Sequence, residues 1–221
     1  METPTIIFDL DGTLIDSSNG ILASLETAFR NEGISPLVPF SNSIIGPSLQ
    51  DILLDICPSP TMDTIDRLSA SFKYIYDNVG CVSAEPFPGV NEMITALSHA
   101  NISVHIATNK RIYPTLRILD VLGWTGFFAQ VLSPDSFNPP LSTKQAVLAS
   151  LIREDSLDPL NCCYIGDRFD DYKAAKVVGI PFVLAEWGFE EDGSVFPPGT
   201  MRMKSPDAEQ LITYLIERDC R

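Results

Sequence analysis

The sequence contains few cysteines, and their spacing excludes two ways in which small folds are often stabilised. Five cysteines occur in 221 residues, and no two of them form a Cys-x-x-Cys pair. An odd number without that spacing disfavours both a disulfide framework and a structural zinc site. The chain also lacks a basic-then-apolar leader and any apolar run approaching the ~20 residues that cross a bilayer. We therefore expect no membrane segment and a location in the reducing cytoplasm.

Basic residues are scarce as well. The sequence has 15 Lys and Arg residues and 29 Asp and Glu residues, which gives a formal net charge of −14. Such a surface repels nucleic acid and anionic membranes, so neither is an expected partner. With 45% hydrophobic residues, the chain can bury a substantial core, either as one large domain or as one domain with an insert.

A short apolar run followed by two acids stands near the start of the sequence. Ile6–Phe8 is too short for a helix and rich in β-formers, so it predicts a buried strand. Residues two apart on a strand point the same way, so Asp9 and Asp11 should project together from its end. Gly12 then allows a sharp turn. Two adjacent carboxylates raise each other's pKa, and a cation would relieve that conflict.

The rest of the chain divides into a helical segment and an alternating one. Residues 16–86 predict helices at 20–31, 50–56 and 61–78 and no strand. From residue 87 onward strands alternate with helices, which is typical of a parallel sheet covered on both faces. The expected strands are 102–107, 127–132, 162–165 and 181–185, followed by an irregular acidic loop to Ser205 and a last helix at 206–218.

We therefore predict an α/β fold with a Rossmann-like parallel sheet and a helical cap inserted after the first strand. The core domain comprises residues 1–15 and 87–221, and the cap domain comprises residues 16–86. The polar residues of interest follow strand ends: Thr108 and Asn109 after one strand, Asp167 and Asp171 after another. In open α/β sheets ligands bind at that edge. Taken singly, Thr108 is better explained as a helix cap and Lys144 as a solvated helix lysine, and Asp170 or Asp171 could each be a helix N-cap.

At these positions the sequence resembles the haloacid dehalogenase-like (HAD) hydrolase superfamily, in the subgroup with a small helical cap and phosphoglycolate phosphatase-like members. The resemblance covers nearly the whole chain. It is carried by four motifs: Asp9-Leu10-Asp11-Gly12-Thr13, Ile106-Ala107-Thr108-Asn109-Lys110, Lys144, and Gly166-Asp167-Arg168-Phe169-Asp170-Asp171. Phe87-Pro88-Gly89-Val90 also resembles the return from cap to core, and Glu186-Trp187-Gly188-Phe189 a loop near the end of such phosphatases.

The resemblance implies a phosphatase with an aspartyl-phosphate intermediate. Asp9 is the expected nucleophile, and Asp11 the acid toward the leaving group and then the base toward water. Thr108 and the backbone N–H of Asn109 are expected to bind phosphate oxygens, which suits a reaction that depends on positioning and charge. Lys144 is expected between Asp9 and the phosphate. Many relatives set this lysine in a Lys-Pro-x-Pro context, whereas here it follows Ser142-Thr143.

The same resemblance implies a metal ion. Several acids directed at a phosphate dianion require a hard cation, and oxygen ligands with retained water favour Mg²⁺. The family pattern makes Asp9, Asp167 and the Asp11 backbone carbonyl direct ligands, with Asp171 supporting them. Asp170 competes for the role of Asp171. The family pattern does not explain Arg168, which follows the expected metal ligand Asp167.

The cap is expected to read the substrate, a small phosphorylated metabolite. Pro47 marks the start of a helix after Gly46, and unpaired N–H groups there could hold a carboxylate or hydroxyl. The hypothesis is that this loop closes over Thr108 and Lys110, with Ser48 as a side-chain donor; an ordinary turn explains the same residues. Across 16–86 there are three bases and nine acids. Neither the exact substrate nor the oligomeric state, monomer or dimer, follows from the sequence.

Other functions remain open beside the phosphatase. Phosphomutases of this group have Gly-Val-Ile after the acid pair and a histidine early in the cap. This chain has Gly12-Thr13-Leu14, and its histidines, His99 and His105, lie outside the cap. A dehalogenase would leave Asp11 and Asp167 without a task. A catalytically silent phosphate-binding protein would not need the full set of acids.

Overall fold

A six-stranded parallel sheet forms the centre of the protein. The computed structural model describes residues 4–189 and 195–219, so the acidic residues 190–192 of the predicted loop lie outside the described residues. The strand order is β5-β4-β1-β6-β7-β8. The strands are β1 (Thr5–Phe8), β4 (Ser103–Ala107), β5 (Gln130–Leu132), β6 (Cys162–Gly166), β7 (Phe182–Ala185) and β8 (Met201–Met203).

The first strand is central because it has neighbours on both sides and is apolar on both faces. Ile7 is opposite His105 of β4 and Tyr164 of β6, and all four residues of β1 are buried. A strand that is buried on both faces usually has a continuous apolar sequence rather than an alternating one, and β1 has such a sequence. Ile6 and Phe8 pack into one hydrophobic cluster, and Ile7 into a second on the opposite face.

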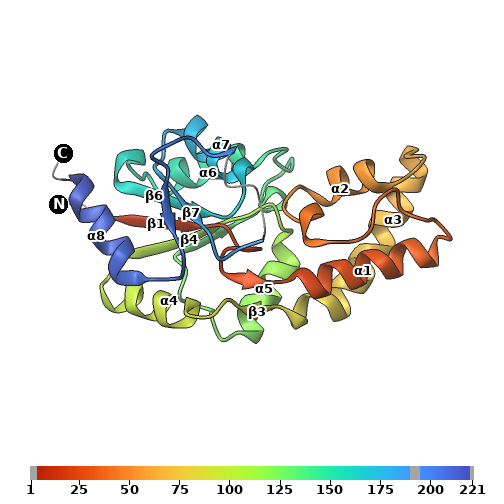
Figure 1. Ribbon diagram of the computed structural model, residues 1–221, viewed down its shortest axis with the longest axis horizontal. Helices are drawn as coiled ribbons and strands as arrows, with labels where there is room; N and C mark the ends of the chain where they lie inside the picture. Colours follow the sequence, from red (N-terminus) through yellow and green to blue (C-terminus); the bar gives the residue numbers. More distant parts are fainter. Residues whose placement is uncertain (1–3, 190–194, 220–221) are drawn as a thin grey trace.

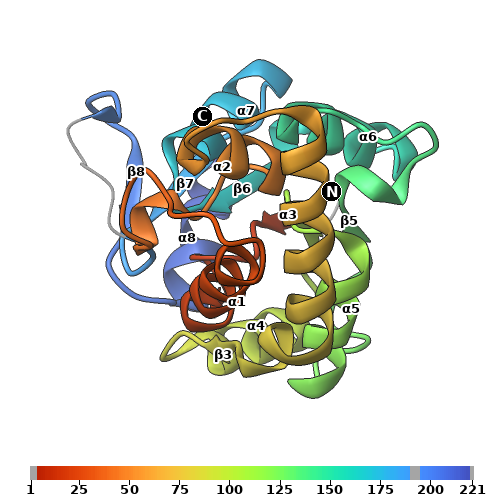
Figure 2. The same ribbon diagram turned by 90° about the vertical axis from the view of Figure 1, so that its right-hand side faces the viewer.

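Helices cover both faces of this sheet (Figures 1 and 2). On the face of Ile7 lie α6 (Lys144–Glu154) and α7 (Phe169–Val178), which supply the apolar residues of the second cluster. On the other face lie α4 (Val90–His99), α5 (Ile112–Val121) and α8 (Ala208–Asp219). The predicted α/β class with a Rossmann-like sheet and an inserted helical cap is thereby confirmed.

The helical segment lies beyond one end of the sheet (Figure 1). It contains α1 (Ser18–Asn31), α2 (Leu49–Ile56), α3 (Met62–Ile75) and a π-helical turn (Tyr76–Gly80). The chain enters it through β2 (Ile15–Asp16) and leaves through β3 (Glu85–Pro86), which pair antiparallel. We call residues 16–86 the cap, and the division into cap and core domains at these two strands remains our proposal.

Three expectations about strands were wrong. Residues 16–86 are not free of strands, because β2 pairs with β3 at the two ends of the cap. Each of these strands has only two residues, which is too few to form an alternating pattern in the sequence. β8 lies in the segment expected to be irregular, where it pairs with β7 at the sheet edge. The strand predicted at 127–132 begins only at Gln130. Within the described residues, no helix is long and apolar enough to cross a membrane.

One helix of the cap packs against its neighbour backbone to backbone. A Cβ on Gly20 of α1 would collide with the carbonyl oxygen of Gly80, at the end of the π-helical turn. A Cβ on Gly80 would in turn collide with the Ser24 hydroxyl and the Tyr76 ring. This close approach fixes the turn that carries Tyr76, which lines the pocket described below.

We predict that Gly20→Ala destabilises the protein although alanine favours helices. Alanine gains up to ~1 kcal/mol of helix propensity over glycine, but overpacking a tight contact costs roughly 1–3 kcal/mol. The free energy of unfolding from denaturant titration should therefore fall. Asn19→Ala, at the exposed neighbouring position, is the matched control and should leave stability nearly unchanged. An equal or greater stability of Gly20→Ala would contradict the packing argument.

Candidate active site

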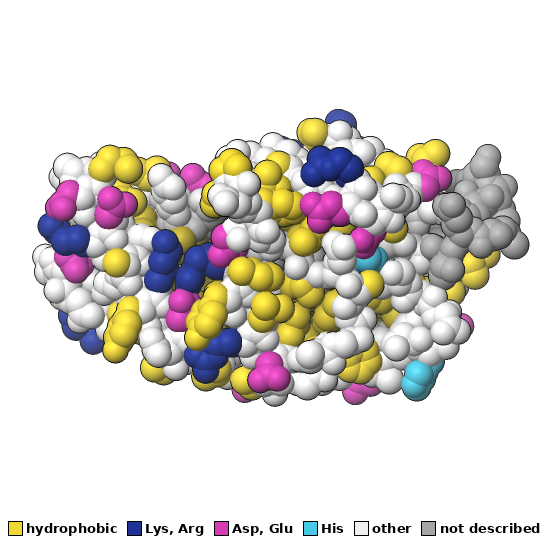
Figure 3. Space-filling view, turned by 180° about the vertical axis from the view of Figure 1, so that it is seen from behind, with side chains coloured by type: hydrophobic (Ala, Val, Ile, Leu, Met, Phe, Trp, Pro, Cys, Tyr) yellow, Lys and Arg dark blue, Asp and Glu magenta, His cyan; other side chains and the backbone are white. Residues whose placement is uncertain are grey.

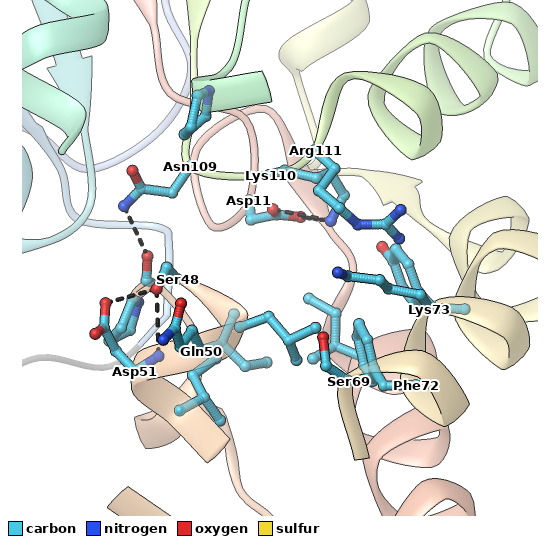
Figure 4. A pocket seen from close by; sticks show the side chains of 18 of the residues that line it. Asp11, Ser48, Gln50, Asp51, Ser69, Phe72, Lys73, Asn109, Lys110 and Arg111 are labelled. Carbon is cyan, nitrogen blue, oxygen red and sulfur yellow. Dashed lines mark hydrogen bonds and ion pairs between the residues drawn. The ribbon is translucent and has the colours of Figure 1, made fainter. Parts of the chain in front are cut away.

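Residues at the carboxyl ends of three neighbouring strands meet in one place. Asp9 follows β1, Thr108 follows β4 and Asp167 follows β6, and all three are buried. Above Asp9 and Thr108 lies a pocket of about 640 Å³ between the sheet and the cap. Figure 4 shows the pocket with Asp11, Lys110 and Arg111 on the core side and residues of α2 and α3 opposite. The predicted residues Gly46, Ser48, Asn109 and Lys144 also line it.

Three buried carboxylates lie together below this pocket. One oxygen from each of Asp9, Asp167 and Asp171 can be chosen so that all three lie within 4.8 Å of one another. Burial raises the pKa of Asp9 to about 6, with Asp171 adding to the rise and Lys144 opposing it. Burial also raises the pKa of Asp167 well above its usual value, and the charges of Asp171 and Asp9 act in the same direction. The cluster is therefore short of positive charge.

Lys144 is the one cation in direct contact with two of these acids, among the residues that the structure describes. Its Nζ lies 2.8 Å from Asp9 Oδ2 and 2.5 Å from Asp171 Oδ1. Thr143 caps α6 by accepting a hydrogen bond from the Ala146 N–H, so the lysine occupies the first turn. Burial alone would lower the pKa of Lys144, but the two carboxylates raise it above its usual value. The lysine is thus charged despite its unusual sequence context.

The unsatisfied oxygens of the cluster fit a divalent cation. Asp9 Oδ1 is buried and has no hydrogen-bond partner among the described residues. Asp167 accepts one bond at each oxygen, from Thr13 Oγ1 at 3.3 Å and from the Phe189 N–H at 3.1 Å, which leaves lone pairs for a metal. Carboxylate oxygens with spare lone pairs are the ligands that Mg²⁺ prefers.

Asp171 is placed differently from the other two acids. Its Oδ1 accepts hydrogen bonds from Lys144 and from the Tyr164 hydroxyl, and its Oδ2 accepts one from the Arg168 N–H. It is therefore suited to hold Lys144 and the start of α7 rather than to bind a metal directly. Asp170 is exposed and pairs with Lys173, so it lies outside the cluster.

The turn after β1 can lie close to Asp167 because it has a glycine, Gly12, at the point of contact. Gly12 has φ of +83°, and a Cβ there would collide with the Asp167 carboxylate. Any other residue would be strained and would push the two motifs apart. The turn is also held by the loop after β7, since Trp187 Nε1 donates to the Thr13 carbonyl at 2.8 Å.

Asp11 lies in a separate environment on the pocket side. The Lys110 Nζ donates to both of its oxygens, at 2.8 and 2.9 Å, and the Ser17 hydroxyl also donates to it. Lys110 lies 4.8 Å above the centre of the Tyr76 ring from the cap. Burial alone would lower the pKa of Lys110, but Asp11 raises it above its usual value. Asp9 and Asp11, which are two residues apart, thus pair with different lysines, Asp9 with Lys144 and Asp11 with Lys110.

Several bonds join the cap to the core around the pocket. Asn109 Nδ2 donates to the Gly46 carbonyl at 3.3 Å, and an Arg168 guanidinium N–H donates to the Asn42 carbonyl at 2.8 Å. On the other side, Arg111 pairs with Asp77. These contacts give Arg168 a structural explanation that the sequence lacked. Ser48 caps α2, and its hydroxyl already donates to Asp51 Oδ2 at 2.6 Å.

Some residues of the site were missed in the sequence. Tyr164, Thr13 and Ser17 each bond to one of the predicted acids. Tyr164 and Gly166 are two apart on β6, and this period-2 spacing places the tyrosine on the same face as the fourth motif. Ser17 is at the N-cap position of α1, but its side chain makes no cap bond and its hydroxyl donates to Asp11 instead.

We predict that Mg²⁺ stabilises the metal-free protein against heat. A ligand present at one hundred times its Kd adds about 2.7 kcal/mol to the free energy of unfolding. Asp167→Asn should lose most of the Mg²⁺-dependent rise in Tm. Asp170→Asn, a matched change at an exposed acid in the same motif, should keep it. No rise in the unaltered protein, or an undiminished rise in Asp167→Asn, would exclude a metal at these acids.

Comparison with known proteins agrees with this geometry. The family model described as haloacid dehalogenase-like hydrolase matches residues 6–185. A phosphoglycolate phosphatase of Xylella fastidiosa (strain 9a5c) is 32% identical over 187 residues, covering 84% of this chain and 81% of the relative. One of Aquifex aeolicus (strain VF5) is 26% identical and covers 96% of this chain and 98% of the relative.

A solved structure has the same fold. The haloacid dehalogenase-like family hydrolase of Streptococcus pneumoniae superposes with a TM-score of 0.82 at 24% identity, covering 96% of this chain and 98% of that one. The resemblance that the four motifs indicate is thereby confirmed. The chain belongs to the haloacid dehalogenase-like hydrolases and is similar to their phosphoglycolate phosphatase-like members.

Proposed function

We propose that the protein is a Mg²⁺-dependent phosphatase that hydrolyses small phosphate monoesters through an aspartyl-phosphate at Asp9. That it is a phosphoric monoester hydrolase rests on its family and on relatives named phosphoglycolate phosphatases. The observation that carries the proposal further is the buried carboxylate of Asp9. One of its oxygens is held by Lys144, and the other is buried and has no hydrogen-bond partner among the described residues.

The proposed reaction has two steps at phosphorus. In the first, an Asp9 oxygen forms a bond to phosphorus while the bond to the leaving oxygen breaks, and Asp11 gives that oxygen a proton. In the second, Asp11 takes a proton from water, whose oxygen bonds to phosphorus and releases Asp9. The ion pair with Lys110 and the bond from Ser17 support this role because they fix the orientation of the Asp11 carboxylate.

The remaining core residues would position charge. Lys144 lies against Asp9 and would reduce its repulsion from the phosphate oxygens. Thr108 and the backbone N–H of Asn109 would bind phosphate oxygens at the end of β4. When bound, a Mg²⁺ ion would supply the further positive charge that the acids lack, held by Asp9, Asp167 and the Asp11 backbone carbonyl, with Asp171 outside its direct ligands.

The loop from Gly46 to Leu49 would contact the leaving group. Its position across the pocket from Thr108 and Lys110 supports this idea. Because the Ser48 hydroxyl is donated to Asp51, a substrate would have to replace that bond to use it. Substrates with short leaving groups, phosphoglycolate among them, are the first to test. We also propose a cytoplasmic location, which the free buried thiols of Cys57 and Cys81 suit.

A phosphomutase is the second candidate within the same chemistry. It would use the same aspartyl-phosphate but would need a group in the cap to hold a phosphorylated intermediate. The two histidines lie in α4 and β4, outside the cap, which weakens that alternative. A silent binding protein would not need two acids with separate cationic partners.

We predict that Asp9→Asn abolishes turnover of a generic aryl phosphate with Mg²⁺, because an amide cannot form the acyl-phosphate. Asp11→Asn should lose roughly 10²–10⁴-fold in kcat, the usual contribution of general acid–base catalysis. Asp170→Asn, at an exposed acid, is the control and should retain activity. Near-normal steady-state turnover by Asp9→Asn, in a sample checked for deamidation, would rule out the mechanism.

A further inference from the structure

Arg168 lies between the cap and the acid cluster, and the proposed function gives it no task. It occupies the N-cap position of α7, directly after Asp167. Its Nη2 donates to the Asn42 carbonyl of the cap at 2.8 Å. Its Nε lies 3.7 Å from Asp167 Oδ2, which is beyond hydrogen-bond distance. The side chain thus has one acceptor on the cap and a second within reach on the proposed metal ligand.

Two loops contact the Arg168 side chain. A Cβ on Gly46 would lie 3.4 Å from its Cγ and its Nε, so residues 42–48, which we call the cap loop, pass directly beside it. Its Cζ also lies 5.8 Å from the centre of the Phe189 ring, and the Phe189 N–H donates to Asp167 Oδ2 at 3.1 Å. Charge-assisted hydrogen bonds are about 2.7–2.9 Å long, so a shift of about 1 Å would bring Nε onto the Asp167 carboxylate.

The charge of Arg168 is only weakly screened by water. Seen from behind, Lys and Arg side chains lie on the surface among Asp and Glu side chains (Figure 3), and exposed pairs contribute little to stability. The side chain of Arg168, by contrast, is only 13% exposed, and that of Asp167 is fully buried. Buried charges interact more strongly because solvent screens them less. A divalent cation at Asp167 would therefore repel the guanidinium and favour its bond to the cap.

We propose that Arg168 is a positioning residue that holds the cap loop over the pocket when a metal ion occupies the site at Asp167. Without a metal ion, the guanidinium can pair with Asp167 whenever the cap loop moves away. With Mg²⁺ at the acids that alternative is disfavoured, so the bond to the Asn42 carbonyl is strengthened. The inference rests on the metal site of the proposed function and adds a coupling between that site and the cap loop. Because such coupling is reciprocal, a closed cap loop would also tighten Mg²⁺ binding.

The test measures hydrogen exchange of the cap-loop amides with and without Mg²⁺, and in parallel the Mg²⁺-dependent rise in Tm. The variants are Arg168→Met, which keeps a long side chain but removes the charge and the donors, and Arg168→Lys, which keeps the charge. Lys173→Met is the matched control, since it removes an exposed lysine of α7 that pairs with the exposed Asp170. No substrate is present, so the measurement does not depend on turnover.

In the unaltered protein, Mg²⁺ should slow exchange in the cap loop about tenfold or more, the usual contribution of a hydrogen bond to a charged group. Arg168→Met should keep the rise in Tm, because Asp167 is intact, but should lose this slowing. Arg168→Lys should retain part of the slowing, and Lys173→Met should retain all of it. A role of Arg168 in stability alone would change the exchange rates to the same extent with and without Mg²⁺.

Three results would overturn the inference while leaving the phosphatase proposal standing. The first is no slowing in the unaltered protein although Mg²⁺ raises its Tm. The second is an undiminished slowing in Arg168→Met. The third is a loss of the rise in Tm in Arg168→Met, which would place the effect of the arginine at the metal site itself.

Failure of the proposed function has a different signature. If Mg²⁺ does not raise the Tm of the unaltered protein, the proposed metal site is absent and the inference fails with it. If the cap loop responds to Mg²⁺ as expected but the protein does not hydrolyse a generic aryl phosphate, the proposed function fails and the coupling through Arg168 stands.

Discussion

The arrangement of this site depends on one buried lysine placed between acids. Lys144 contacts Asp9 and Asp171 at once, and without it the only described cation in contact with the three buried carboxylates would be Arg168, 3.7 Å from Asp167. Removing one partner of a buried ion pair leaves an uncompensated charge, which costs far more than an exposed pair contributes. The lysine therefore links β1 to α7, because the acids it bridges belong to the first and fourth motifs. Tyr164 and the Arg168 N–H complete the support by fixing Asp171 from below.

A second constraint gives the two acids of the first motif, Asp9 and Asp11, different surroundings. Both acids line the pocket, but Asp9 pairs with Lys144 in the buried cluster, while Asp11 pairs with Lys110. In the proposed reaction one carboxylate must attack and the other must exchange protons, so the different surroundings of the two acids correspond to two different tasks.

Much of this could be predicted from the sequence because the core follows local rules. The apolar run before Asp9 and the alternation of strands with helices from residue 87 both depend on short-range patterns, and they led to the correct fold class. The pairing of β2 with β3 could not be predicted, since it joins two-residue segments at opposite ends of the cap. Nor could the position of Arg168, because its bond to the Asn42 carbonyl spans 126 residues. Tertiary partners of this kind leave no periodic trace in one sequence.

The short β2–β3 ribbon ties the position of the cap to the state of the proposed acid. Ile15 of β2 accepts a bond from the Gly12 N–H and also bridges to Asp11 itself, only four residues away. Ser17, which follows β2, and Tyr76, which lies beneath Lys110, both belong to the cap. A swing of the cap about this ribbon would therefore change the hydrogen-bond partner and the cation environment of Asp11 together. Closure of the cap would then complete the surroundings of Asp11, so that the proton donor is fully assembled only when the leaving group is enclosed.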